Sequence, residues 1–103
     1  MSNKSKWAEA NNWYDALDIK GKLIANCTAS DDETDYSSMS LQELLDEMHL
    51  SEGEAEKKCD DMWKTSIRSS TYAYMRLSGH SPQESDKVAL ETDKEERKEF
   101  FIS

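Results

Sequence analysis

The sequence predicts a small all-α domain, and three observations support this class. Only three glycines and one proline interrupt the 103 residues, which favours long helices over many short strands. Apolar residues recur at spacings of three and four along most of the chain, which is the period of an amphipathic helix. Two segments also begin with residues typical of a helix N-terminus. A chain of this length supports one domain with one hydrophobic core.

The composition limits the size of that core. Apolar residues make up 36% of the chain and charged residues 34%, against usual values of about 45–50% (a count that includes glycine) and about 25%. Nine aromatic residues and five methionines offset this in part, because each aromatic side chain buries a large area. We expect a cytoplasmic protein without a membrane partner, because we find neither an apolar signal segment nor the roughly 20 apolar residues of a membrane span.

The first expected helix covers residues 5–26. Its apolar side chains, which include Trp7 and Tyr14, lie on one face at helical spacing. The pattern continues past Gly21, although a glycine inside a helix costs roughly 1 kcal/mol relative to alanine. Residues 22–28 could instead form a short strand, but a single strand has no evident partner in this sequence. The helix is therefore favoured.

A polar connection over residues 28–39 leads to the second expected helix, residues 40–49. Ser40 and Glu43 fit a capping box, in which each residue satisfies a backbone N–H of the other. Leucine and methionine residues then follow at positions i, i+3, i+4 and i+7, which predicts an amphipathic helix.

The third expected helix is long and covers residues 52–78. Ser51 and Glu54 form a second capping box at its start. It should end before Gly79, because glycine readily adopts the left-handed conformation that terminates helices and Pro82 follows soon after.

These three helices define an acidic helical domain over residues 1–82. Residues 83–103 are expected to form a charged C-terminal helix or a flexible tail, because residues 83–99 contain only three adjacent apolar residues. The terminal segment 100–102 is apolar and either packs back on the core or docks on a partner.

The sequence shows no catalytic or metal-binding pattern, so we predict a protein that is not an enzyme and has no cofactor or metal. The thiols and imidazoles are Cys27, His49, Cys59 and His80. Their spacings match no zinc site, and there is no glycine-rich loop for phosphate. Cys59 lies on the apolar stripe of the third helix, which is typical of a buried structural thiol.

The most distinctive feature of the chain is an acidic block over residues 31–61. It contains twelve acidic residues and two lysines, for a net charge of −10, whereas the whole chain carries −9. A charge confined to one segment can produce a directed field that attracts a positively charged partner. The acids are Asp31, Asp32, Glu33, Asp35, Glu43, Asp46, Glu47, Glu52, Glu54, Glu56, Asp60 and Asp61.

The same block argues against direct binding to nucleic acid. The second and third helices resemble a helix-turn-helix in length and in the short turn between them. The start of the would-be recognition helix carries Glu52, Glu54 and Glu56, where a DNA-binding protein needs cations to displace counterions. This surface would repel a duplex.

We therefore predict an inhibitor that binds a basic, nucleic-acid-binding protein by imitating nucleic acid. In size and composition the chain resembles the small acidic phage proteins that inhibit restriction and CRISPR enzymes. The alternative is an ordinary solvated acidic face without a binding role. The predicted contact residues are Asp31, Asp32, Glu33, Asp35, Asp46, Glu47, Glu52, Glu54 and Glu56.

A second hypothesis is a helical oligomerisation, assembly or regulatory subunit, such as a homodimer. The third helix is acidic at its start and basic towards its end, so two copies could pair antiparallel. The interface would contain Met62, Trp63, Ile67 and Tyr74, although a Trp on a helical stripe is more often part of a core.

Overall fold

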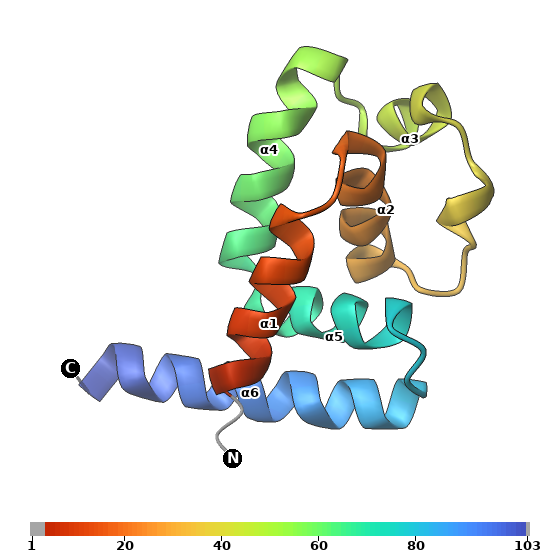
Figure 1. Cartoon of the computed structure of the whole chain (residues 1–103). Helices are drawn as coiled ribbons and strands as arrows, with labels where there is room; N and C mark the ends of the chain where they lie inside the picture. The colour runs from red at the N-terminus through yellow and green to blue at the C-terminus, as the bar shows by residue number, and fades with distance from the viewer. Residues whose placement is uncertain (1–3, 103) are drawn as a thin grey trace.

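A computed structural model describes the backbone of residues 4–102 and the side chains of residues 6–97 (Figure 1). The all-α class is confirmed, and no strand occurs between residues 4 and 102. Every helix in this range is too short or too polar to cross a bilayer. The elements are α1 (Lys4–Asp15), α2 (Ile19–Ser30), the 3-10 helix η1 (Tyr36–Ser38), α3 (Leu41–Met48), α4 (Glu52–Thr65), α5 (Ile67–Leu77) and α6 (Pro82–Ile102).

The expected helix over residues 5–26 is wrong, because the chain breaks between Asp15 and Ile19. Asp18 is the N-cap of α2, and its Oδ1 accepts a hydrogen bond from the Gly21 N–H at 2.8 Å. This side chain competes for a backbone donor that a continuous helix would need. Gly21 lies inside α2, where an added Cβ would be 3.1 Å from the Cβ of Leu17. Residues 22–28 are helical, so the strand alternative is also wrong.

The expected helix over residues 52–78 is likewise divided, with a break at Ser66. Hydroxyl groups take over the hydrogen bonds at this bend. Thr65 Oγ1 donates to the Asp61 carbonyl at 2.8 Å, and Ser70 Oγ donates to the Trp63 carbonyl at 2.9 Å. Serine and threonine compete with the helical backbone in this way, which allows α5 to leave the direction of α4.

The predicted helix ends at residues 40, 51 and 79 are confirmed. Both capping boxes form, with the side chain of each serine accepting from its glutamate N–H and each glutamate side chain accepting in return. Gly79 adopts a φ of 98°, and the His80 N–H donates to the Met75 carbonyl at 3.0 Å. This is the Schellman arrangement that glycine favours at a helix C-terminus.

Helix α5 lies at the centre of the fold and contacts α1, α2, α4 and α6. Figure 1 shows α6 running alongside α5, with α1 and α4 meeting this pair from one side. Residues 83–97 are therefore not a flexible tail, because α6 buries Ser85, Ala89 and Thr92 completely. The prediction for the apolar segment 100–102 concerns side chains that lie outside the described residues.

The core consists of two clusters rather than one, and α2 and α4 contribute to both. The loop-side cluster joins α2, η1, α3 and α4. It contains Leu23, Cys27, Tyr36, Leu44, Leu45, Ala55 and Cys59. The aromatic cluster joins α1, α2, α4 and α5. It contains Ala10, Tyr14, Ala25, Trp63 and Ala73.

Trp63 is the largest side chain in the aromatic cluster and has no exposed surface. Its ring stacks on Tyr14, with 4.5 Å between centroids and 11° between planes, and lies 5.9 Å from the ring of Trp13. The Tyr14 hydroxyl accepts a hydrogen bond from Asn26 Nδ2 at 3.1 Å. Trp63 of α4 is therefore packed directly on α1, and it is connected to α2 through the hydrogen bond between Tyr14 and Asn26.

We expect Trp63→Ala to lower the free energy of unfolding by about 3–5 kcal/mol, because it leaves a large cavity in the core. Trp63→Phe should lose less, since it retains a ring to stack on Tyr14. Met62→Ala, at the neighbouring but partly exposed position, should cost about 0.5 kcal/mol or less. Urea unfolding followed by far-ultraviolet circular dichroism measures all three. An equal loss for Trp63→Ala and Met62→Ala would contradict the central role of Trp63.

Candidate functional site

The acidic residues fall into two groups according to whether a cation neutralises them. In the acidic block, three form ion pairs: Asp32 with Arg76 at 2.9 Å, Glu54 with Lys58 at 3.4 Å and Asp60 with Lys22 at 3.4 Å. The other nine acids of the block have no lysine or arginine within 4 Å in the described part of the chain. Outside the block, ion pairs hold Glu9, Asp15, Asp86 and Asp93.

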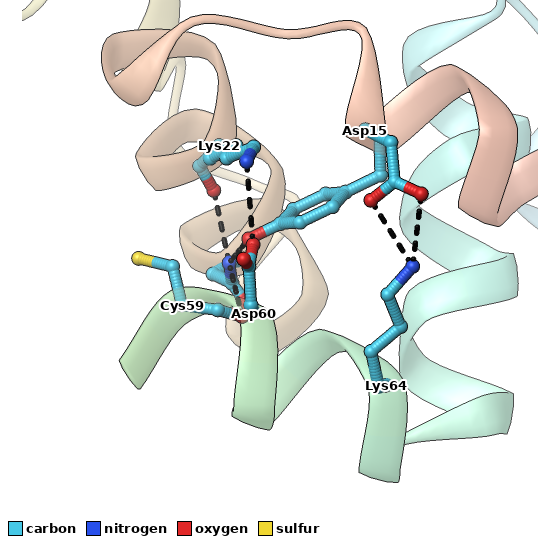
Figure 2. A network of polar contacts seen from close by, with 7 residues as sticks. Asp15, Lys22, Cys59, Asp60 and Lys64 are labelled. Carbon is cyan, nitrogen blue, oxygen red and sulfur yellow. Dashed lines mark hydrogen bonds and ion pairs between the residues drawn. The ribbon is translucent and has the colours of Figure 1, made fainter. Parts of the chain in front are cut away.

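Two lysines outside the acidic block, Lys22 and Lys64, link helices to one another (Figure 2). Lys64 of α4 contacts both carboxylate oxygens of Asp15 in α1, at 3.1 and 3.2 Å. Lys22 of α2 pairs with Asp60 of α4 and lies 5.4 Å from the centroid of the Tyr14 ring. These cations are held at the junction of α1, α2 and α4, away from the first turns of α4.

The unpaired acids lie mainly on α3 and at the start of α4. These helices are joined by a tight turn at His49, which adopts the left-handed conformation with φ of 57°. We call this region the α3–α4 acidic surface, and all six of its carboxylate side chains are exposed. Its members are Glu43, Asp46, Glu47, Glu52, Glu54 and Glu56, of which Glu54 is paired with Lys58.

The capping boxes fix two of these carboxylates in place. Glu43 Oε1 accepts from the Ser40 N–H at 3.1 Å, and Glu54 Oε1 accepts from the Ser51 N–H at 3.2 Å. These backbone hydrogen bonds lower the pKa of both glutamates below the ordinary value. Glu47, Glu52 and Glu56 make no such bonds among the described residues. Their carboxylates are therefore free to meet a partner.

The loop before η1 uses most of its acids for its own structure. Asp31 accepts from the Glu33 N–H at 3.0 Å and from Thr34 Oγ1 at 2.9 Å. Asp35 caps η1 and accepts from the Ser37 N–H at 3.1 Å. Among the acids of this loop, only Glu33 has a side chain without a hydrogen bond or ion pair within the described residues. Of the predicted contacts in this loop, Glu33 is the one that is wholly available.

Asp32 connects the loop to α5 and contributes little free charge. Its Oδ2 accepts from the Tyr72 hydroxyl at 2.6 Å and from Arg76 Nε at 2.9 Å. These two hydrogen bonds, the first being the stronger influence, lower the pKa of Asp32. The hydrogen bond that the Tyr72 hydroxyl donates to Asp32 also raises the pKa of Tyr72. Sequence reasoning missed Tyr72 and Arg76 as partners, since they lie 40 and 44 residues away and no local pattern marks the pairing.

The four residues predicted for an oligomer interface do not form one exposed stripe. Trp63 has no exposed surface, and the ring of half-buried Tyr74 packs 5.3 Å from the ring of Trp13. Ile67 is half-buried, whereas Met62 is 39% exposed. Self-association stays a prediction, but any such interface would have only the exposed parts of Met62, Ile67 and Tyr74 from this set.

Neither a metal site nor a relationship to known proteins supplies a function. Within residues described by the structure, no group of three or more His, Cys, Asp or Glu side chains could hold a metal ion. Comparisons with protein-family models, curated proteins and solved structures found no match. The chemistry of the surface is therefore the basis for the proposals below.

The pairing of Asp32 predicts a dependence of stability on pH. Because the folded-state pKa of Asp32 lies below the ordinary value of an aspartate, the stabilisation that its ionised form provides is fully present above that ordinary value. The contribution is lost as the pH falls through the lower, folded-state pKa. We expect Asp32→Asn to lower the free energy of unfolding by about 1 kcal/mol at neutral pH. The difference from the wild type should shrink as the pH falls below the ordinary pKa of an aspartate.

Urea unfolding at neutral and acidic pH measures this difference. Glu33→Gln is the matched control, because the neighbouring carboxylate has no partner and its removal should leave stability nearly unchanged. If Asp32→Asn lowers the free energy of unfolding equally at both pH values, the ionised pair of Asp32 and Arg76 is not the source of the loss.

Proposed function

We propose that the protein binds a positively charged surface of a nucleic-acid-binding protein through the α3–α4 acidic surface and so keeps that surface from its nucleic acid. The observation that carries this proposal is that, among the described residues, no lysine or arginine pairs with the exposed carboxylates of Glu47, Glu52 and Glu56, whereas the neighbouring Glu54 is paired with Lys58. The proposed action is binding without catalysis.

Electrostatics favours such a partner over other classes. Proteins that bind nucleic acids present Lys and Arg in positions that contact phosphates. Carboxylates held on two adjacent helices can occupy the same cationic positions, and their field accelerates the encounter with a positive surface. Because screening by salt weakens interactions between exposed charges, the complex should be strongly salt-dependent.

The position of the charges on ordered helices also supports binding. Two of the carboxylates are fixed by capping boxes, and α3 and α4 are anchored to the loop-side cluster by Leu44, Leu45 and Ala55. A partner would therefore meet charges that are already arranged, and binding would cost less conformational entropy than it would for a disordered acidic segment.

The proposal predicts that Glu47→Gln, Glu52→Gln and Glu56→Gln together weaken capture of the partner by at least about tenfold. These positions are chosen because none takes part in a capping box. The control is the triple variant Ala8→Lys, Asn12→Lys and Gln83→Lys, which raises the net charge by the same amount at exposed positions of α1 and α6. Capture by the control should equal that of the wild type.

The measurement is a pull-down from a lysate of the organism that encodes the protein, at about 50 mM and about 500 mM salt. The expected partner elutes at the higher salt and is displaced by added DNA or RNA. Equal capture by both triple variants, or a partner insensitive to salt and to nucleic acid, would reject the proposed function.

A further inference from the structure

A cleft opens where the ends of α2, α3, α4 and α5 meet, beside the acidic surface. It has a volume of about 500 Å³, within the range of about 300–1,000 Å³ usual for binding sites. A second cleft of about 240 Å³ adjoins it and shares Asn26, Ser30 and Met48 with it. We call the two together the methionine groove, because Met48 lines both parts and Met62 lines the larger one.

The groove contains an exposed apolar side chain that the fold does not use. Met62 and Leu77 are the two large hydrophobic residues that are exposed among the described side chains, at 39% and 42%. Methionine is flexible and polarisable, so it adapts to different apolar groups. Met62 lines the same cleft as half-buried Met48, so the lining offers two methionines to an incoming apolar side chain.

The two exposed hydrophobic residues differ in whether a cation lines their cleft. Leu77 lines a cleft of about 270 Å³ whose charged lining residues are Arg76 and three acids of the loop, Asp32, Glu33 and Asp35. No lysine or arginine lines either part of the methionine groove. Its one charged lining residue is Glu47, which belongs to the α3–α4 acidic surface. The lining of the methionine groove is mixed, with two methionines and Ala29 beside Asn26 and several serines, and the groove joins the acidic surface at Glu47.

We propose that the methionine groove receives an apolar side chain from a basic amphipathic helix of the partner, while the α3–α4 acidic surface contacts the Lys and Arg residues of the same helix. This inference rests on the proposed function and specifies the part of the partner that is bound. The charges would determine the rate of encounter and the orientation of the helix. The apolar contact would supply affinity that salt does not remove.

The test uses a synthetic 18-residue helical peptide of Lys and Leu, with its leucines on one face, and a control peptide with Gln in place of every Leu. The protein carries ¹³C-methyl methionine, and binding is followed by NMR. We expect the Met48 and Met62 methyl signals to shift and saturate as the Leu peptide is added. The signals of Met39, outside the groove, and of buried Met75 should stay unchanged.

Substitutions then separate the apolar contact from the charges. Met48→Gln together with Met62→Gln should raise the Kd for the Leu peptide by at least about tenfold, as expected for the loss of a buried methionine contact. Leu77→Gln removes the other exposed hydrophobic residue and should leave the Kd unchanged.

Three results would overturn the inference. The first is equal affinity for the Leu and Gln peptides, or no effect of the methionine substitutions, while Glu47→Gln, Glu52→Gln and Glu56→Gln still weaken binding. In that case the groove proposal fails and the proposed function stands. The second is no binding of either peptide at about 50 mM salt, which would count against both. The third is a shift of the Met48 and Met62 signals with protein concentration alone, which would make a second copy the occupant.

Discussion

The packing of Trp63 between helices is the contact on which the remaining arrangement depends. Its ring comes from α4, stacks on Tyr14 of α1 and shares a buried cluster with Ala25 of α2 and Ala73 of α5. Its carbonyl accepts the hydroxyl of Ser70 just after the bend at Ser66. This one residue therefore holds the direction of α4 and the point at which α5 departs. The position of the acidic start of α4 follows from the same contact.

The distribution of charge is a second consequence of the fold. Lys22 and Lys64 join helices through Asp60 and Asp15, and Arg76 holds the loop before η1 through Asp32. These three cations count toward the net charge of the sequence, but each of them is held in an ion pair within the fold. Apart from Glu54, which pairs with Lys58, the carboxylates of α3 and of Glu52 and Glu56 in α4 have no cation partner among the described residues. The sequence total of −9 understates the local charge that they produce.

Local patterns predicted part of this structure well. The helical class, both capping boxes and the helix end before Gly79 depend on residues a few positions apart, so the sequence alone was sufficient. The breaks at Asp18 and Ser66 were missed because a side-chain hydrogen bond to the backbone competes with a helical pattern that otherwise continues. The pairing of Asp32 with Tyr72 and Arg76, and the burial of Trp63, required the fold. A stripe of apolar residues does not reveal whether it faces the same chain or another one.

The α3–α4 acidic surface also affects how copies of the protein meet one another. Two copies approaching with these surfaces face to face would bring like carboxylates together, and they repel within about 10 Å at 0.1 M salt. An exposed hydrophobic residue such as Met62 would ordinarily be a site of unwanted self-association. Because Glu47 lines the groove as well as the acidic surface, we expect like charge to oppose the approach of a second copy through this face. The same charges that would attract a cationic partner would then also reduce aggregation at high protein concentration.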